Sequence, residues 1–524
     1  MEQIQTRWNG WGIPGHDDPL ATHEPAWRWL AQAFAMPALL ATPPRNLWDT
    51  TLPPSQLTDT AGRKLIALLG VSGVGRSDFE RARHAAGRGL CDLLRLRNGD
   101  LSTAPDAVLY PRTEADVGAL LKLCAEMDIA VIPFGGGTGD IPCVRGSHSA
   151  VVALNLSALN HVTSVDTVSG LAEAEAGILG PELERQLGAR GMMLGHRPDN
   201  FEFSSLGGWI AQPNAGQEAT RHGEVEDWLA GLRVATPQGV LTPSGLPDLR
   251  YLMLGSRGAL GVITSATIRV RAVAQKEEHR AYLFPDFASG LAVLREAQRI
   301  GLPHAFLRLS DDGRTRLLRA LEQAGEDADW RARLFDVYLS VRRFDGTAAR
   351  LVAGFAGSDA EVTWARKHFD SLAKRLGALR LGKDATWRSQ RFAAGYRRDT
   401  LLDRGVGMDR LELWASWAVL PSRYLAVRAA LKQAMRSHAP RAGAHGLVLC
   451  EVGPARIDGA TLTFTWLYPR ILDNGLSQAE AIRRAALNAA QATQGSSALA
   501  REALIGIKCA LDPKAILNPG VVIP

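Results

Sequence analysis

The sequence predicts an α+β fold made of two units. The chain has 524 residues, enough to bury a large core and to form more than one domain. From Pro105 to about residue 270, short apolar strands alternate with helices. From about residue 276, longer strands and helices follow in β-α-β order. This second pattern is typical of an antiparallel sheet with helices on one face.

The first hundred residues differ from both units. Residues 1–100 should form a helical N-terminal region, which prolines such as Pro37 interrupt. Within it, residues 77–96 have the apolar spacing of one amphipathic helix, and Ser77 is placed to cap its first turn. We place the first unit at 101–275, the second at 276–455 and the C-terminal segment at 456–524.

Apolar runs and capping residues predict the individual elements. Thr113 should cap a helix that ends near Met127, because Glu114 and Asp116 in its first turn favour the helix dipole. A hairpin over 230–242 should turn at 237–239. The first unit should also contain strands at 107–110, 129–134, 151–156, 172–176 and 263–270, and a helix at 181–187. The second should contain strands at 281–284, 305–309 and 411–419, and helices at 288–299 and 422–438.

Composition and charge exclude several classes of protein. The 60 basic and 54 acidic residues leave a net charge of +6 without a long Lys or Arg run, so we expect no nucleic-acid partner. Five scattered cysteines without a CxxC pair argue against a disulfide framework and against a zinc site. No stretch approaches the roughly 18 apolar residues of a membrane-spanning helix, and the N-terminus has no apolar signal segment. We therefore expect a cytoplasmic protein without a metal site.

The segment Pro133–Gly139 is the first candidate binding site. A buried strand runs directly into three consecutive glycines, Gly135, Gly136 and Gly137. Glycines let backbone N–H groups converge on an anion without obstruction by a Cβ, and they tolerate positive φ. A diphosphate would suit this loop, although a simple tight turn would need the same residues.

Two later segments concentrate small and polar residues in a similar way. Residues 195–216 combine a Pro-Asp turn, the pair Ser204-Ser205 and two glycines before a helical segment. Residues 255–263 place further glycines directly before a strand. None of the three segments follows the GxGxxG pattern of a Rossmann nucleotide site. They predict a dinucleotide cradle of a different type.

In order and spacing, the three segments resemble the vanillyl-alcohol oxidase family of FAD-linked oxidases, also called the PCMH type. Within it, most of the chain is similar to the alkylglycerone-phosphate synthases. Further matching stretches are Trp8–Gly12, 258–271, 284–296 and Leu517–Gly520. The resemblance implies a PCMH-type FAD-binding domain of two subdomains, an antiparallel-sheet cap domain, and a C-terminal segment that returns to the FAD-binding domain. It leaves the oligomeric state open, with a homodimer as one option.

FAD is the cofactor that this resemblance implies. The glycine segment would wrap its diphosphate, the second segment would line it and the third would complete the adenine side. The positions are Pro133, Phe134, Gly135, Gly136, Gly137, Thr138, Gly139, Asp199, Asn200, Phe201, Glu202, Phe203, Ser204, Ser205, Gln212, Pro213, Asn214, Ala215, Arg257, Gly258, Ala259, Leu260, Gly261, Val262 and Ile263. Many relatives attach the flavin to a histidine in the glycine loop. Because 134–140 contain none, we expect non-covalent FAD, with His148 as a solvated loop residue.

The resemblance implies a less complete set of catalytic residues. Two family arginines are present, Arg308 and Arg398, which would stabilise negative charge on the flavin or bind a substrate phosphate or carboxylate. A run of histidines found late in the synthases has no counterpart here. The strand expected to carry the family's catalytic tyrosine has Thr463 or Thr465 at the matching position, and Tyr468 would serve only after a shift of register.

Other acid–base groups are candidates only by position. Glu412, Trp414, Trp417, His445 and Glu451 lie on or beside strands of the second unit, and core packing would equally explain the tryptophans. We therefore expect an FAD-dependent oxidoreductase on a synthase-like scaffold, with flavin N5 as the reacting centre and a small phosphorylated or carboxylated substrate. The alternatives are an alkylglycerone-phosphate synthase of ether-lipid synthesis with a rearranged active site, and a catalytically inactive FAD-binding subunit.

Overall fold

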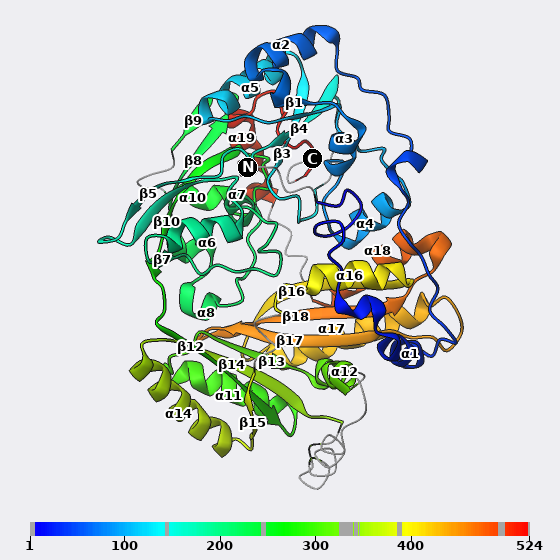
Figure 1. Ribbon diagram of the computed structural model, residues 1–524, viewed down its shortest axis with the longest axis vertical. Coiled ribbons are helices and arrows are strands. Elements are labelled where there is room, and N and C mark those ends of the chain that lie inside the picture. Colours follow the sequence, from blue (N-terminus) through cyan, green and yellow to red (C-terminus); the bar gives the residue numbers. More distant parts are fainter. Residues whose placement is uncertain are drawn as a thin grey trace.

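The computed structural model contains two upper sheets and one larger lower sheet, as Figure 1 shows. It describes residues 6–141, 146–242, 248–323, 339, 344, 346–384, 390–490 and 498–521. The upper sheets use strands between Val74 and Arg269, and the lower sheet uses strands between Lys276 and Pro469. The chain therefore completes one half before it begins the other, apart from its two ends.

The first upper sheet has the strand order β1-β2-β4-β3. Its strands are β1 (Val74–Gly75), β2 (Ala107–Leu109), β3 (Ile129–Phe134) and β4 (Ala150–Asn155). β3 and β4 pair in parallel and are almost entirely buried, as is typical of parallel strands covered on both faces. Helices α2 (Asp59–Leu69) and α5 (Glu114–Glu126) share a core with this sheet. Because β3 ends at Phe134, the glycine segment begins at the end of the sheet.

The second upper sheet is antiparallel, in the order β5-β6-β10-β8-β9. Its strands are β5 (Val162–Asp166), β6 (Leu171–Glu175), β8 (Leu229–Thr236), β9 (Gly239–Leu241) and β10 (Val262–Arg269). Helices α6 (Gly180–Gly188) and α7 (Leu206–Ala211) pack against it, and Leu183, Trp209 and Ile268 share one core. A two-stranded ribbon of β7 (Met192–Met193) and β11 (Arg271–Ala272) lies beside it.

The lower sheet has seven antiparallel strands in the order β15-β12-β14-β13-β17-β18-β16. They are β12 (Lys276–Phe284), β13 (Phe306–Ser310), β14 (Ala349–Gly357), β15 (Leu379–Lys383), β16 (Val406–Ser416), β17 (Leu447–Ala455) and β18 (Gly459–Pro469). One face carries helices α11 (Phe287–Arg299), α14 (Asp359–Arg375), α17 (Leu420–Ser437) and α18 (Gly475–Ala489). Side chains of β18 alternate between the faces: Phe464 and Trp466 join this core, whereas Thr463 and Thr465 line a cavity on the other side.

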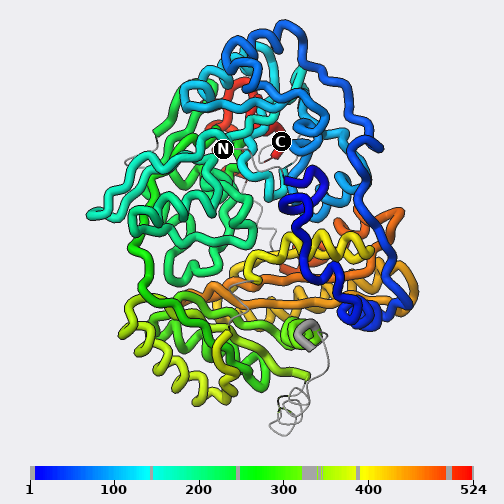
Figure 2. The backbone as a smooth tube through the Cα atoms, viewed as in Figure 1, coloured from blue at the N-terminus to red at the C-terminus, as the bar shows by residue number. Residues whose placement is uncertain are grey.

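The two ends of the chain connect the halves. Helix α1 (Glu24–Ala33) packs Trp27 against Leu449 and Leu467 of the lower sheet. Helix α19 (Ala498–Leu511) leads back to the first upper sheet, where Leu517 pairs with Val131. Figure 2 shows the red C-terminal segment among the upper elements and the blue N-terminal segment running down to the lower sheet.

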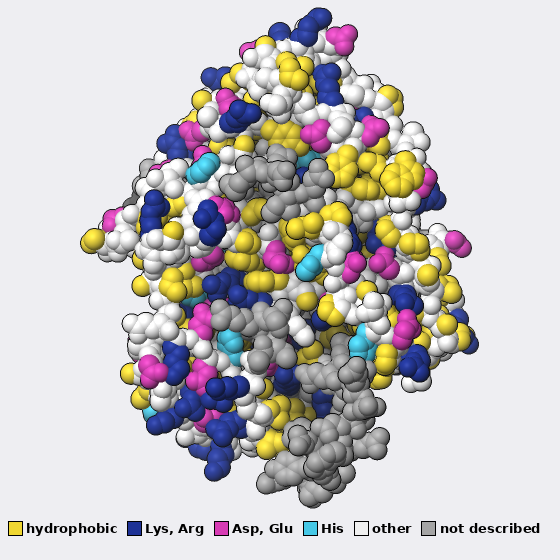
Figure 3. Space-filling view, in the orientation of Figure 1, with side chains coloured by type: hydrophobic (Ala, Val, Ile, Leu, Met, Phe, Trp, Pro, Cys, Tyr) yellow, Lys and Arg dark blue, Asp and Glu magenta, His cyan; other side chains and the backbone are white. Residues whose placement is uncertain are grey.

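The remaining helices are short or peripheral. They are α3 (Asp78–Arg83), α4 (Leu90–Arg97), α8 (Ala219–His222), α9 (Val225–Trp228), α10 (Arg250–Met253), α12 (Asp312–Gln323) and α16 (Ala394–Asp403), with 3-10 turns η1 (Pro19–Thr22), η2 (Leu47–Asp49), η3 (Val71–Gly73) and η4 (Leu472–Asn474). No described helix combines the length and apolarity needed to cross a membrane. Basic and acidic side chains are interspersed over the face that Figure 3 presents.

Residues 77–96 form two helices, so the prediction of one continuous helix is wrong. Ser77 does cap α3 through a capping box, but α3 ends at Arg83 and α4 begins at Leu90. A Cβ at Gly87 would overlap the carbonyl oxygen of Gly139. The helix is therefore interrupted where the backbone contacts the end of the glycine segment. The spacing of apolar residues in the sequence does not report such a long-range contact.

Capping and strand patterns elsewhere are confirmed. Thr113 caps α5 through a capping box with Asp116, and β3 spans the predicted residues 129–134. Cys143 lies outside the described residues, and the other four cysteines are free thiols.

Candidate active site

A cavity of about 300 Å³ lies where the two upper sheets meet, and we call it the glycine-lined cavity. Its walls come from all three segments that the sequence singled out. Predicted residues that line it are Pro133, Phe134, Gly135, Gly136, Gly137, Thr138, Gly139, Asn200, Ser204, Ser205, Gln212, Pro213, Asn214, Arg257, Gly258, Gly261 and Ile263. The fold therefore brings together stretches that are more than a hundred residues apart.

The glycine segment brings unpaired backbone donors to this cavity. The N–H groups of Gly136, Gly137, Thr138 and Gly139 have no hydrogen-bond acceptor among the residues that the structure describes. Buried or half-buried N–H groups left in this way favour a bound anion. The segment thus fits the diphosphate of a dinucleotide.

Close packing explains why these positions are glycines. A Cβ on Gly136 would overlap the carbonyl oxygen of Phe203, and a Cβ on Gly135 would overlap the hydroxyl of Ser205. Gly137 has a φ of +70°, a backbone angle that residues other than glycine rarely adopt. Glycine at these positions therefore leaves the backbone N–H donors accessible and lets the first segment pack directly against the second.

The second segment is fixed by short polar contacts. The Asn200 amide donates to the Thr138 hydroxyl at 2.9 Å. Ser205 caps α7 by accepting from the Gly208 N–H at 3.3 Å, and the Trp209 indole donates to the Ser204 hydroxyl at 2.7 Å. Within the described part of the chain, the amide oxygens of Asn200 and Asn214 have no donor, so they are available to a ligand.

Eight predicted cofactor residues lie outside the glycine-lined cavity. Phe201, Phe203, Ala259, Leu260 and Val262 are buried in the protein, and Glu202 is half-buried. Asp199 and Ala215 line two neighbouring cavities. The lining residues that the sequence missed are Asp140, Ile141, Leu156, Ala176, Gly207, Gly208, Trp209, Ala211 and Asn518. Most of these residues are next to predicted ones in the sequence. Asn518 belongs to the closing motif Leu517–Gly520, and that motif was the sequence signal from which it could have been predicted.

His84 supports the glycine segment from behind, a role that the sequence did not reveal. Its imidazole is fully buried, with its ring centroid 4.4 Å from that of Phe134. One ring nitrogen lies 2.7 Å from the Glu80 carbonyl oxygen, and the other lies 2.8 Å from the Asn155 amide nitrogen. Burial lowers the pKa of His84 to about 3, so the ring is neutral and accepts from Asn155.

His148 is not a solvated loop residue, so that expectation is wrong. It is 9% exposed. Its imidazole contacts the Asp128 carboxylate at 2.8 Å and the Ala515 carbonyl oxygen at 3.1 Å. His148 therefore fixes the C-terminal segment against the first upper sheet.

A second cavity, of about 200 Å³, adjoins the first, and we call it the arginine-lined cavity. Consecutive residues line the two cavities: Asp199 lines this one and Asn200 lines the glycine-lined cavity. The basic residues that line it are Arg308, Arg314, Arg350, Arg391, Arg397 and Arg410. They come from β13, α12, β14, α16 and its preceding turn, and β16.

Arg308, one of the predicted catalytic residues, is held firmly in this cavity. It donates to the carbonyl oxygens of Gly453 at 2.7 Å and Gln217 at 3.1 Å. It also contacts the Glu451 carboxylate at 3.3 Å, and Arg314 contacts the same carboxylate at 3.1 Å. Two guanidinium groups thus share one carboxylate, which leaves excess positive charge at this corner.

The charge on Glu451 follows from these neighbours. Burial raises its pKa, but Arg314, Arg308 and Arg410 outweigh burial, so the pKa is lowered overall. Glu451 is therefore an ionised partner of arginines rather than a general base near neutral pH. Among the described residues, the Nε–H groups of Arg314 and Arg410 have no acceptor.

Asp199 links the two cavities. Its carboxylate pairs with Arg410 of β16 and accepts from the Gln217 amide at 2.7 Å. Gln217 in turn receives the hydrogen bond from Arg308 through its backbone carbonyl. A residue predicted to touch FAD is thus tied to the arginine-lined cavity instead.

The structure places the other two predicted catalytic residues elsewhere. Tyr468 is 1% exposed and faces the helix-covered side of β18, so it lines neither cavity. Arg398 is half-buried, with its guanidinium 5.8 Å from the centre of the Trp11 ring, and the adjacent Arg397 lines the arginine-lined cavity.

The weaker candidates are scattered over three cavities and the surface. Glu451 lines the arginine-lined cavity, and Glu412 and Trp414 line a third cavity that also touches Asn214. Trp417 is half-buried and donates to the carbonyl oxygens of Arg456 and Ile457. His445 lines a separate cavity on the lower sheet.

Known proteins share both the sequence and the fold of this chain. Residues 105–243 match the family described as FAD binding domain, and residues 275–466 match FAD linked oxidases, C-terminal domain. An alkyldihydroxyacetonephosphate synthase of Trypanosoma brucei brucei is 26% identical over 99% of this chain and 92% of its own. The Dictyostelium discoideum alkyldihydroxyacetonephosphate synthase is 31% identical over 73% of this chain and 64% of its own.

Solved structures extend the comparison. One of an alkyldihydroxyacetonephosphate synthase superposes with a TM-score of 0.87 at 26% identity, covering 99% of both chains. p-Cresol methylhydroxylase with substrate bound superposes with a TM-score of 0.64 at 16% identity over 90% of this chain and 99% of its own, and this likeness concerns the fold alone.

Proposed function

The chain belongs to the FAD-linked oxidase family, and on this premise we propose that it is an FAD-dependent enzyme that acts on a phosphorylated ketone. The activity that fits best is that of an alkyldihydroxyacetonephosphate synthase, the name carried by similar proteins along nearly the whole chain. In that exchange the ester bond to a fatty acid breaks and an ether bond to a fatty alcohol forms, without net oxidation.

One observation carries the proposal: the consecutive residues Asp199 and Asn200 line the arginine-lined and the glycine-lined cavity respectively. A ligand whose diphosphate lies at Gly136–Gly139 would extend towards these two residues. Arginine forms strong, often bidentate hydrogen bonds with phosphate. The unsatisfied Nε–H groups of Arg314 and Arg410 are placed to take part in such contacts.

Each group of residues has a distinct role in the proposed reaction. FAD, when bound, would supply an electrophilic ring nitrogen for the chemistry at the substrate carbon. The amides of Gly136–Gly139 hold its diphosphate, and Asn200 fixes the loop through Thr138. Arg308 and Arg314 hold the substrate phosphate, and Glu451 orients both guanidinium groups. The buried surroundings strengthen these charge interactions by excluding water.

A direct test uses the purified holoenzyme with an acyl-dihydroxyacetone phosphate and a long-chain alcohol. The proposal predicts an ether product and one fatty acid released per turnover, with no oxygen consumption. Failure to form any ether product under conditions in which a known synthase is active would contradict it.

A flavin oxidoreductase is the second candidate, and the composition of the arginine-lined cavity favours it. Its described lining has threonines, Thr463 and Thr465, on β18 and contains no histidine or tyrosine. The proton transfer of the synthase reaction would need an acid–base group, and no histidine or tyrosine of the described lining supplies one. Bleaching of the flavin by a small phosphorylated or carboxylated alcohol, with stoichiometric reduction of an added acceptor, would support this second function.

A further inference from the structure

A cavity of about 400 Å³ on the lower half of the molecule has no part in the site described above. It lies between α1, α12, α17 and the start of β17, and α1 and α12 are close together in the lower part of Figure 1. Its polar walls are basic, and its other walls include Trp29 and Leu447. The basic side chains that line it are Arg316, Arg428, Lys432, Arg436 and His445. We call it the Lys432 cavity.

The charges in this cavity are only partly neutralised. Asp312 pairs with Arg316 at 3.2 Å and with Arg428 at 2.8 Å. Within the described residues, no carboxylate lies within ion-pair distance of Lys432 or Arg436. Lys432 is largely exposed, but partial burial lowers its pKa, and Arg428, Arg316 and Arg436 lower it further, with Asp312 opposing them. Excess positive charge therefore collects at one place.

Helix geometry makes this arrangement unfavourable in the absence of a ligand. Arg428, Lys432 and Arg436 are four residues apart on α17, so they lie along one side of the helix. Like charges at this spacing repel one another and destabilise a helix. The helix dipole favours Arg436 in the last turn, but Lys432 lies a full turn earlier.

We propose that the Lys432 cavity binds a phosphate monoester that carries an apolar group. The phosphate would lie between Lys432 and Arg436 of α17 and His445, because all three side chains line the cavity and can donate hydrogen bonds. His445 is positioned by backbone contacts, since its N–H donates to the Phe34 carbonyl oxygen at 3.2 Å. Trp29, Leu447 and Leu449 supply an apolar wall for the remainder of the ligand. Leu449 also lines the arginine-lined cavity, so a ligand here would lie one side chain away from the substrate.

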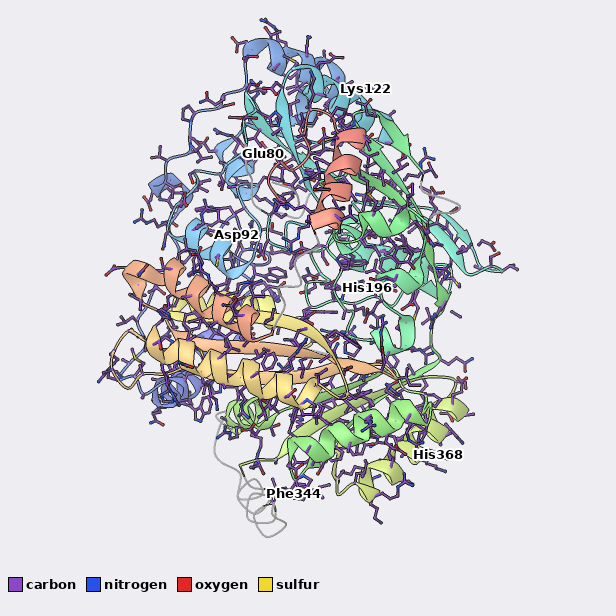
Figure 4. All side chains as sticks on the ribbon, turned by 180° about the vertical axis from the view of Figure 1, so that it is seen from behind. Glu80, Asp92, Lys122, His196, Phe344 and His368 are labelled. Atoms are coloured by element: carbon purple, nitrogen blue, oxygen red, sulfur yellow. The ribbon has the colours of Figure 1, made fainter. Side chains whose placement is uncertain are left out.

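The test measures binding of 1-naphthyl phosphate to the holoenzyme by isothermal titration calorimetry. The double variant K432E/R436E should lose one class of sites, with affinity reduced by about tenfold or more, while its FAD content stays unchanged. K122E is a charge-reversal control with one substitution, because Lys122 is exposed on α5 in the upper part of Figure 4. R314A separates the two cavities, since it should weaken only the other class of sites.

A second arm distinguishes a soluble ligand from a lipid headgroup. Vesicles of phosphatidylcholine with and without phosphatidic acid are sedimented with the wild-type protein and with K432E/R436E. Binding of naphthyl phosphate that depends on Lys432 and Arg436 supports a soluble ligand. If the wild-type protein sediments only with the vesicles that contain phosphatidic acid, and the double variant does not, the ligand is the headgroup of a lipid. Wild-type behaviour of the double variant in both arms would overturn the proposal.

Discussion

The Asn200 side-chain amide donates to the Thr138 hydroxyl at 2.9 Å. This bond joins two segments that are 62 residues apart, the glycine segment and the segment that leads into α7. The side-chain amide oxygen of Asn200 has no donor among the described residues. Asn200 thus holds the loop with one end of its amide and leaves the other end for a ligand.

Replacing Asn200 should therefore weaken cofactor binding without unfolding the protein. N200A removes the bond to Thr138 and the free acceptor, and each such hydrogen bond is worth about 1 kcal/mol. We expect the Kd for FAD to rise about fivefold to thirtyfold, measured by flavin fluorescence during titration of the apoprotein. An unchanged Kd in N200A would contradict this role.

A methyl group at Gly136 should disrupt the cradle itself. G136A places a Cβ against the Phe203 carbonyl oxygen, so the backbone must move. We expect loss of most bound FAD and a fall of several degrees in the melting temperature. G118A is the matched control: Gly118 lies within α5 with open space around its Cβ, and alanine there should stabilise the helix by about 0.5–1 kcal/mol. Full FAD content in purified G136A would show that the loop tolerates the displacement.

His84 should make stability depend on pH. Its pKa is about 3 in the folded protein and 6.5 in the reference state, so between these values only the unfolded chain takes up the proton. The contribution of His84 to the free energy of unfolding is present above pH 6.5 and is lost as the pH falls towards 3. From neutral pH to pH 5 the loss is about 2 kcal/mol. Urea unfolding at pH 7.5 and pH 5 should show this extra loss in the wild type and not in H84Q. Equal losses in both proteins would exclude His84 as the cause.

Substrate affinity should depend on the shared arginine pair. R314A removes one of the two guanidinium groups on Glu451 but leaves Arg308 bound to two backbone carbonyls. Loss of a charge-assisted hydrogen bond costs about 1.5–3 kcal/mol, so KM for the phosphorylated substrate should rise about tenfold or more. The FAD content should stay at the wild-type level. R295A, an exposed position on α11, should have no effect. A KM that remains constant in R314A would remove Arg314 from the substrate site.

Local sequence signals predicted the elements better than the contacts between them. The capping boxes at Ser77 and Thr113 and the apolar run of β3 are local patterns, so they were predictable. The break before Leu90 depends on contact between Gly87 and Gly139, which lie 52 residues apart, and apolar periodicity does not report such contacts. The buried positions of His84 and His148 depend on long-range packing in the same way.

The glycine-lined cavity was easier to predict from the sequence than the arginine-lined cavity. Glycine clusters and small polar residues mark the glycine-lined cavity, since its walls are mainly backbone. The arginine-lined cavity is assembled from single side chains on separate strands and helices, which share no sequence pattern. Tyr468 shows what the sequence does not predict. Side chains alternate between the two faces of β18, and the strand register determines that Tyr468 points towards the core.

The most direct test of the account is the visible spectrum of the purified protein, followed by acid precipitation. A glycine-lined cradle without a histidine tether predicts a yellow protein with about one FAD per chain, all of it released into the supernatant. Flavin that remains with the precipitate would contradict the untethered cradle. A colourless protein that takes up no FAD after incubation with an excess would contradict the cofactor site itself.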